Sequence, residues 1–337
     1  MRFNQLGRRE FITLICGAAA TWPLAANAQQ SDRTRRIGVL TGGTESDPQV
    51  VAGLAAFKAA LQEQGWADGR NIRIDYRFGA ADVHRMQQFA KELVGLRPDV
   101  LVGHTTPAVG ALKHETTTIP IVFVSVSDPV GSGFAESLPH PGGNITGFVN
   151  LEASLGGKWI EVLKDILPSV SRAVLMFNPE TAPYSAYYLQ PFETAARAQG
   201  IVPDAAQVRD EADIERVVAD VAGSTTTGLV IMPDAFTSAR QNVDLIVALA
   251  ARHRVLVIYP YRYMVAAGGL VSYGTVSADL FRRATVYIDR ILKGTSPSDL
   301  PIQLPTQFEL AVNLKTARAL GIEMPPTMLG RADEVIE

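Results

Sequence analysis

The chain has 337 residues and a formal net charge of −3, with 31 Lys and Arg residues against 34 Asp and Glu residues. A chain of this length is long enough to form two lobes. The lack of a basic patch argues against nucleic-acid binding. Cys16 is the only cysteine, and the five histidines show no metal-ligand spacing. We therefore expect no disulfide framework, no metal site and no cofactor.

The N-terminus is typical of an export signal. Arg8-Arg9 is followed by an apolar run, and Ala26-Asn27-Ala28 supplies the small residues of a cleavage site. We predict a twin-Arg signal peptide over residues 1–28, cleaved near Ala28, and a mature protein in the periplasm. The general export route is the alternative. No later apolar run in the sequence is long enough to span a membrane.

The first predicted lobe alternates strands and helices. Its expected strands cover residues 36–40, 71–77, 99–102 and 119–126, and its expected helices cover 49–64 and 82–95, with a third that starts near Pro107. Asp47 or Ser46 is expected to cap the first of these helices. The β-α-β-α-β-α-β order predicts a parallel sheet with helices on both faces.

A second lobe repeats this design after a cluster of turn-forming residues at 139–144, which we interpret as the first crossing between the lobes. Its expected strands are 172–177, 201–207, 228–232 and 255–258, and its expected helices are 155–167, 184–199, 211–222 and 238–253. A strand at 269–273, a helix at 278–292, an extended connector, a strand at 308–312 and a helix at 314–320 follow.

The predicted fold class is α/β, with two Rossmann-like parallel-sheet lobes joined by a three-crossing hinge. We assign residues 36–147 and 274–307 to the first lobe, and residues 148–273 and 308–330 to the second. In open α/β sheets, ligands bind at the carboxyl ends of the strands. We therefore expect a ligand cleft between the polar turns of the two lobes.

The most specific predicted anchor in this cleft is the helix start at Thr105-Thr106-Pro107. Hydroxyl groups and free backbone N–H groups converge there with a favourable dipole, so we expect it to bind a ligand carboxylate. Pro107 has no N–H, which leaves Ala108 and Val109 as backbone donors, and Ser127 adds a hydroxyl. The alternative for Thr106 is a plain helix cap.

A donor group on the ligand would need a carboxylate, and Asp128 and Asp234 follow strand ends on opposite lobes. Each precedes or follows a proline, so a structural turn is the competing interpretation for both. Aromatic residues in the predicted cleft turns are candidates to stack on the ligand. They are Tyr184, Tyr259 and Tyr273. Thr44 is a weaker candidate, and whether His104 or Glu45 contacts the ligand is left open.

Several motifs resemble those of a known family. They are R-R-E-F-I and A-N-A-Q-Q in the leader, I-P-I-V-F-V-S-V-S-D-P-V-G-S-G at 119–133, P-G-G-N-I-T-G-F at 141–148, F-E-L-A-V-N-L-K-T-A-R-A-L-G-I at 308–322 and R-A-D-E-V-I-E at 331–337. The chain resembles the tryptophan/tyrosine-type substrate-binding proteins of ABC transporters, which have the type I periplasmic binding protein fold. The resemblance implies a monomer that closes on a small ligand and delivers it to an ABC permease in the inner membrane.

An enzymatic role is not favoured. No G-x-S-x-G elbow, P-loop or G-x-G-x-x-G pattern follows a predicted strand. The expected ligand is a small carboxylated solute, either an amino acid or an aromatic acid. A ligand-sensing subunit for a membrane receptor is the main alternative, because it would use the same two lobes, and an exported enzyme is a weaker one.

Overall fold

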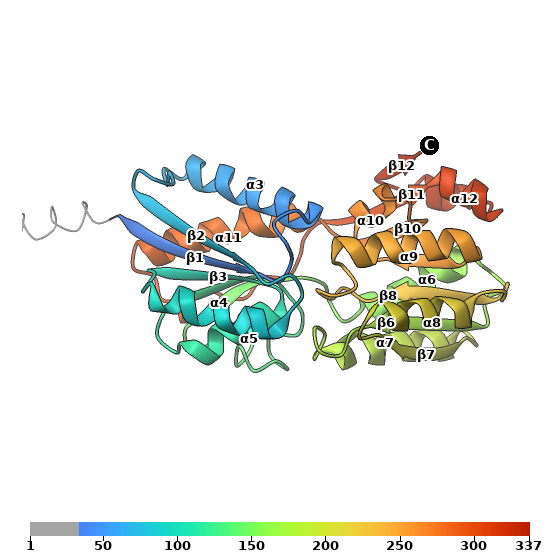
Figure 1. The fold of residues 1–337 in the computed structure, drawn as a ribbon, viewed down its shortest axis with the longest axis horizontal. Coiled ribbons are helices and arrows are strands. Elements are labelled where there is room, and N and C mark those ends of the chain that lie inside the picture. The colour runs from blue at the N-terminus through green and yellow to red at the C-terminus, as the bar shows by residue number, and fades with distance from the viewer. Residues whose placement is uncertain (1–33) are drawn as a thin grey trace, which may run out of the picture.

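The computed structural model describes residues 34–337 and shows two α/β lobes side by side along the long axis of the molecule (Figure 1). The predicted signal peptide lies outside the described residues. The first lobe contains a five-stranded parallel sheet in the order β2-β1-β3-β4-β5. Its strands are β1 (Arg35–Thr41), β2 (Ile72–Phe78), β3 (Val100–His104), β4 (Ile121–Val126) and β5 (Ile145–Val149). As predicted, β2 lies at an edge of the sheet.

The first sheet is covered on both faces, as its apolar strands predict. One hydrophobic core packs α3 (Pro48–Glu63) and α11 (Ser277–Leu292) against the strands, and Phe57 and Phe281 are fully buried in it. The other face carries α4 (Val83–Gly95) and α5 (Thr106–Glu115), with Leu93 and Leu112 in the core. Lobe one therefore includes a helix, α11, that follows the second lobe in sequence.

The second lobe contains a seven-stranded sheet in the order β12-β11-β10-β9-β8-β6-β7, in which β10 and β11 pair antiparallel and the other neighbours pair parallel. Its strands are β6 (Arg172–Phe177), β7 (Val202–Gln207), β8 (Thr227–Ile231), β9 (Leu256–Tyr259), β10 (Val271–Thr275), β11 (Phe308–Asn313) and β12 (Glu334–Ile336). The short final strand β12 is an element that the sequence pattern did not predict.

Two hydrophobic cores cover this second sheet. Trp159 and Phe192 lie in the core under α6 (Leu155–Ile166) and α7 (Ser185–Ala198), and α12 (Leu314–Leu320) and α13 (Pro326–Leu329) pack on the same face. On the other face, α8 (Glu211–Val221), α9 (Arg240–His253) and α10 (Arg262–Ala266) enclose Ile214 and Met264. One short 3-10 helix, η1 (Pro297–Asp299), lies in the connector before β11.

The first crossing lies later in the chain than predicted. Residues 139–144 do not cross between lobes, because β5 follows them and pairs with β4 in the first sheet. The crossing comes after Val149, so the predicted boundary at residues 147 and 148 falls inside a strand. Gly147 permits the close approach of β5 to β4, since a Cβ at this position would lie 2.2 Å from the carbonyl oxygen of Phe123.

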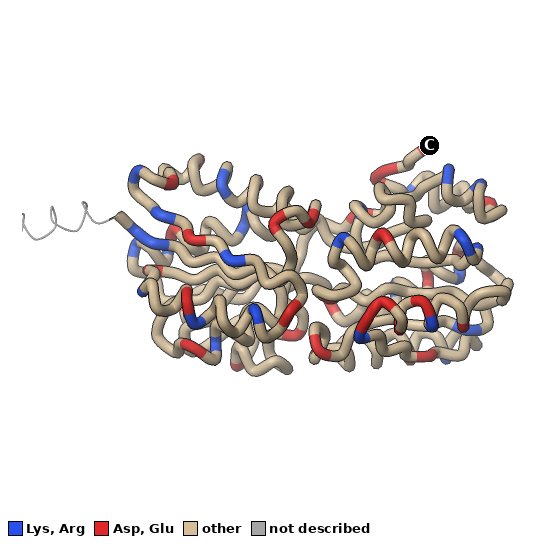
Figure 2. The backbone as a smooth tube through the Cα atoms, in the orientation of Figure 1, with Lys and Arg blue, Asp and Glu red and all other residues tan. Residues whose placement is uncertain are grey.

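The two later crossings flank α11. The strand β10 continues to Thr275 in the second sheet, two residues beyond the predicted boundary, and α11 then packs on α3. The connector runs along the first lobe, where the Gln303 N–H donates to Gly147 O at 2.9 Å, before β11 returns at Phe308. Lys and Arg residues are distributed over both lobes (Figure 2). Within residues 34–337, no helix is long and apolar enough to cross a membrane.

Candidate functional site

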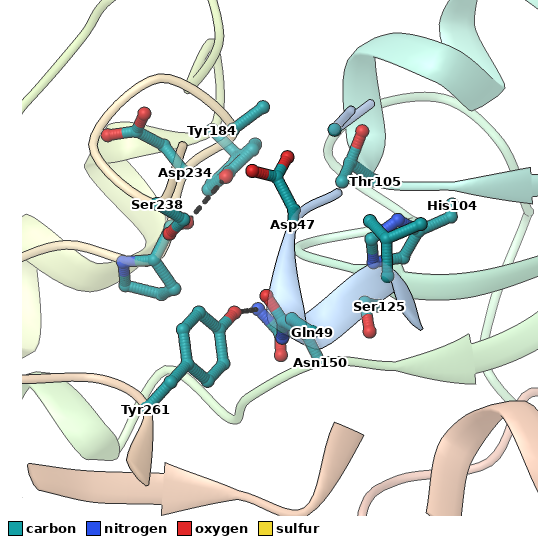
Figure 3. Close-up of a pocket in the computed structure, with 14 residues that line it drawn as sticks. Asp47, Gln49, His104, Thr105, Ser125, Asn150, Tyr184, Asp234, Ser238 and Tyr261 are labelled. Carbon is teal, nitrogen blue, oxygen red and sulfur yellow. Dashed lines mark hydrogen bonds between the residues drawn. The ribbon is translucent and has the colours of Figure 1, made fainter. Parts of the chain in front are cut away.

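A small cavity of about 40 Å³, partly open to solvent, lies between the two lobes. In the first lobe its walls come from the β1–α3 loop, the β3–α5 turn and the end of β4. In the second lobe they come from the segments that follow β6, β8 and β9, and Asn150 lines the cavity at the first crossing. Figure 3 shows these side chains converging from both lobes. The cavity therefore forms at the carboxyl edges of both sheets, where parallel sheets place ligands.

Four buried polar atoms in the cavity wall have no hydrogen-bond partner among the described residues. They are His104 Nδ1, Thr105 Oγ1, Ser125 Oγ and Ser238 Oγ. A buried polar group without a partner costs about 1–3 kcal/mol, so native structures rarely keep four of them together. The arrangement is typical of a site whose hydrogen bonds are completed by a bound polar ligand.

The backbone around two of these atoms is strained. Thr105 has φ 82° and ψ 153°, and Ser125 has φ 57°. A positive φ is unfavourable for a residue with a Cβ, and especially for β-branched Thr. Strain of this kind clusters at binding sites, where the surrounding structure holds a side chain in a position it would not otherwise adopt. Here the strained turns hold the Thr105 and Ser125 hydroxyls at the cavity wall.

His104 stays neutral in this environment. Its side chain is buried against Phe281, with the ring centroids 5.0 Å apart. Burial lowers the pKa of His104 to about 4, because the imidazolium form would lose its hydration. A neutral imidazole offers one donor and one acceptor, so its partnerless nitrogen can serve a ligand of either kind.

Asp47 lines the cavity, although the sequence pattern predicted only that it caps a helix. It stands at the N-cap of α3 but makes no side-chain capping bond there. Its carboxylate instead accepts hydrogen bonds from Thr44 N at 2.6 Å and from Arg240 N at 3.2 Å, in the other lobe. Gly43 permits this orientation, because a Cβ there would lie 2.6 Å from the Asp47 Oδ2 atom.

Comparison with known proteins identifies the family. The model of the family described as ABC transporter substrate binding protein matches residues 45–336. The chain belongs to this family. A tyrosine-binding protein of Clostridioides difficile (strain R20291) is 23% identical over 296 residues, which cover 87% of this chain and 83% of the relative.

Solved structures share the fold of this substrate-binding protein. A conserved domain protein of Vibrio cholerae is 27% identical, with a TM-score of 0.84, and the match covers 90% of this chain and 100% of that one. The ABC domain from Streptococcus pneumonia in complex with L-Trp is 24% identical, with a TM-score of 0.81 and the same coverage. The two-lobed type I periplasmic binding protein fold expected from the sequence is therefore confirmed.

The two threonines of the predicted carboxylate anchor have different surroundings in this substrate-binding protein. Thr105 lines the cavity, whereas the Thr106 hydroxyl accepts from Ser127 N at 3.1 Å and thereby joins the β3 and β4 turns. Ser127 is fully buried, and its hydroxyl accepts from Tyr188 of the second lobe at 2.8 Å. Ser127 thus lies outside the cavity wall and contributes to contact between the lobes.

The carboxylates of the two predicted aspartates accept hydrogen bonds within the protein, Asp234 from its own turn and from the turn after β6, and Asp128 from its own turn. Asp234 reaches the cavity wall, but its carboxylate accepts from Asn178 N, Thr181 Oγ1, Phe236 N and both the N–H and the hydroxyl of Thr237. Burial nevertheless raises the pKa of Asp234. Asp128 accepts from Gly131 N at 2.8 Å and borders a second hollow of the interlobe cleft.

Of the remaining residues predicted to bind the ligand, some line the cavity and others are buried elsewhere or lie outside it. Tyr184 lines both hollows of the cleft, and its hydroxyl donates to Pro233 O at 2.7 Å. Tyr259 is buried in the core under α9, and Tyr273 stacks on Phe308, so neither lies in the cavity wall. Thr44 contributes through its backbone N–H to Asp47. Glu45 does not line the cavity.

Several cavity residues were not predicted from the sequence. Asn150 donates to the Tyr261 hydroxyl at 2.9 Å, and this bond links the first crossing to the β9–α10 turn. Ser125 lies inside an apolar strand and Ser238 follows a turn, so neither carries a distinctive local pattern. For Tyr261 the only signal was its position directly after a predicted strand. These residues become recognisable once both sheet edges face each other.

Proposed function

We propose that this protein is an exported solute-binding subunit that captures a small carboxylated ligand, an amino acid or an aromatic acid, and delivers it to an ABC permease. Membership of the substrate-binding family supports capture and delivery. We infer a carboxylated ligand from the buried Thr105 hydroxyl. This hydroxyl has no hydrogen-bond partner among the described residues and stands at the N-terminus of α5 in the interlobe cavity.

The start of α5 suits a carboxylate. Backbone N–H groups in the first turn of a helix lack intrahelical partners, and the helix dipole favours a negative charge there. Pro107 has no N–H and Val109 N already donates to Thr105 O at 3.1 Å, which leaves the Thr106 and Ala108 N–H groups as the donors of the first turn that are unpaired within residues 34–337. No Lys or Arg among the described residues lines the cavity, so an anion would be bound by neutral donors, among which the Thr105 hydroxyl stands at the helix start.

Aromatic side chains in the remaining wall favour an aromatic ligand. Tyr184 and Tyr261 contribute rings from the second lobe, and aromatic side chains pack favourably against one another. The tyrosine-binding protein of Clostridioides difficile and the L-Trp complex from Streptococcus pneumonia are similar over most of the chain. These relatives favour aromatic amino acids among the carboxylated candidates.

The proposed location is the periplasm. The twin-Arg pattern before Ala28 motivates export by signal-peptide cleavage, and substrate-binding proteins of ABC importers work outside the cytoplasmic membrane. Closure of two lobes on the ligand would give the permease a signal that distinguishes the loaded form. We propose that the protein acts as a monomer.

Ligand screening of the purified mature chain tests this proposal. Thermal shift followed by calorimetry would compare amino acids, aromatic acids and sugars. We expect the melting temperature to rise with an amino acid or an aromatic acid, because a ligand that binds only the folded state stabilises it. Tight binding of an uncharged sugar, without a response to any acid, would overturn the proposed ligand class.

A further inference from the structure

Asp47 carries a buried carboxylate that forms no ion pair among the described residues, although the Arg240 guanidinium lies near enough to interact with it electrostatically. Its exposed fraction is 5%, and it lines the interlobe cavity. It forms no ion pair within residues 34–337, and the nearby Arg240 guanidinium is paired with Asp244 at 2.8 Å. A buried charge is costly unless it is paired and hydrogen-bonded. Because Asp47 lines the cavity without an ion pair of its own, a cationic group of a bound ligand can pair with it.

The contrast with Asp234 shows why Asp47 is the better partner for a cation. Asp234 is similarly buried but accepts five hydrogen bonds, which occupy its lone pairs. Asp47 accepts two, from Thr44 N and Arg240 N. A carboxylate has about four lone-pair sites, so Asp47 retains acceptor capacity. Figure 3 shows the Asp47 carboxylate between Thr105 and Tyr184.

Two adjacent glycines bring Asp47 close to the proposed carboxylate anchor. A Cβ on Gly42 would lie 2.3 Å from Thr105 Oγ1, and a Cβ on Gly43 would lie 2.6 Å from Asp47 Oδ2. Consecutive Cα atoms are about 3.8 Å apart, so both polar groups lie against neighbouring residues of one loop. Both groups also line the same cavity, so a single ligand that carries an ammonium and a carboxylate can contact both.

We propose that Asp47 binds the ammonium group of the ligand and makes the protein select α-amino acids over amino-free acids of the same shape. The proposal rests on the function proposed above and specifies the ligand class. The partnerless His104 and Ser125 atoms in the same wall are independent signs of a polar ligand. Because Asp47 also accepts from Arg240 N, the residue that holds the ammonium also contacts the second lobe.

Matched ligands and an isosteric variant test the role of Asp47. Calorimetry would compare L-tyrosine with 3-(4-hydroxyphenyl)propionate, which lacks the amino group, and with tyramine, which lacks the carboxylate. L-Tryptophan and indole-3-propionate form a second pair. The variants are Asp47→Asn and, as a control, Asp128→Asn, which removes the same charge at the cleft but outside the cavity.

We expect the wild type to bind at least one of the two amino acids about 10- to 100-fold more tightly than its amino-free counterpart, the scale of a charged hydrogen bond. Asp47→Asn should reduce this ratio to near one, whereas Asp128→Asn should leave it unchanged. An amino-free acid that binds wild type as tightly as its amino acid would overturn the role of Asp47 while leaving the proposed carboxylate site intact. The wild-type ratio decides this even if Asp47→Asn does not fold.

The other outcomes separate the two proposals. If tyramine binds as tightly as L-tyrosine, and Asp47→Asn weakens both, the ammonium contact is supported and the carboxylate site fails. If the ratio persists in a folded Asp47→Asn variant, the ammonium is bound elsewhere and the inference is wrong. If none of the five compounds binds, both the aromatic amino acid ligand and the role of Asp47 are overturned.

Discussion

Asp47 in the first lobe accepts a hydrogen bond from the backbone N–H of Arg240, at the start of α9 in the second lobe, at 3.2 Å. The N-cap residue of α9 is Ala239, which has no side chain that can cap the helix. Asp47 therefore supplies a cap across the interlobe gap, and its negative charge suits the positive end of the helix dipole. The Tyr188 hydroxyl adds a second bond across the gap, to Ser127 Oγ at 2.8 Å.

Removal of the Asp47 side chain should favour the open arrangement of the lobes. We expect Asp47→Ala to increase the radius of gyration of the ligand-free protein, because one of the bonds between the lobes is lost. Small-angle X-ray scattering would measure this. Asp128→Ala is the control, since Asp128 accepts a hydrogen bond within its own turn, from Gly131 N. Identical scattering from Asp47→Ala and wild type would show that the cap does not bias closure.

The adjacent threonines should respond differently to substitution. Thr105→Val removes a hydroxyl that has no partner among the described residues, so affinity for a carboxylated ligand should fall about 10- to 100-fold, the scale of a hydrogen bond to a charged group, with little change in stability. Thr106→Val leaves the buried Ser127 N–H without its acceptor and should cost about 1–3 kcal/mol of unfolding free energy.

Calorimetry and urea unfolding would separate these two effects. Thr117→Val, on the exposed surface after α5, serves as the control for the loss of a threonine hydroxyl. Loss of stability in Thr105→Val without any change in affinity would contradict the assignment of its hydroxyl to the ligand.

His104 should make stability depend on pH. Its pKa is lowered to about 4 by burial, whereas an unfolded histidine has a pKa near 6.5, so the unfolded state binds the proton more readily between these values. The contribution of His104 to unfolding free energy should therefore rise with pH from about 4 to about 6.5, by about 3 kcal/mol.

Urea unfolding between pH 4 and pH 7 would test this dependence. His104→Gln should flatten the pH profile, and His114→Gln should not, because the His114 side chain is 84% exposed. The comparison uses the slope with pH, so a uniform loss of stability in His104→Gln does not affect it. An unchanged slope would mean that the pKa of His104 is the same in the folded and unfolded states.

Gly274 should tolerate no side chain. A Cβ there would lie 1.8 Å from the carbonyl oxygen of Pro260, next to the crossing from β10 to α11. We expect Gly274→Ala to destabilise the protein by about 1–3 kcal/mol or more, because the backbone must shift. Gly95, at the end of α4, has open space around its Cβ position, so Gly95→Ala should be neutral or stabilising by about 0.5–1 kcal/mol. Thermal unfolding would compare the two variants, and equal melting temperatures would contradict the predicted clash.

Local sequence patterns were enough to predict most of the strands and helices. Apolar runs and their periodicity located the four predicted strands of the first lobe, its parallel order and the polar turns at the strand ends, because these features depend on short-range patterns. The antiparallel pair β10–β11 in the second sheet departs from the predicted parallel order. The same patterns could not assign β5 to a sheet. Its place depends on the close approach of Gly147 to Phe123, a contact between two strands that neither strand's own pattern can reveal.

Tertiary contacts decide which polar groups remain available to bind a ligand. In the sequence, Thr105 and Thr106 look equivalent, and Asp234 looks more suitable than Asp47. In the fold, Thr106 and Asp234 are occupied by hydrogen bonds to distant turns, whereas Thr105 and Asp47 face the cavity. The capacity of a polar group to bind a ligand depends on which residues of the whole chain already bond to it. Asp47, for example, accepts a hydrogen bond from the backbone N–H of Arg240, which lies 193 positions later in the sequence. No local pattern can predict such a contact.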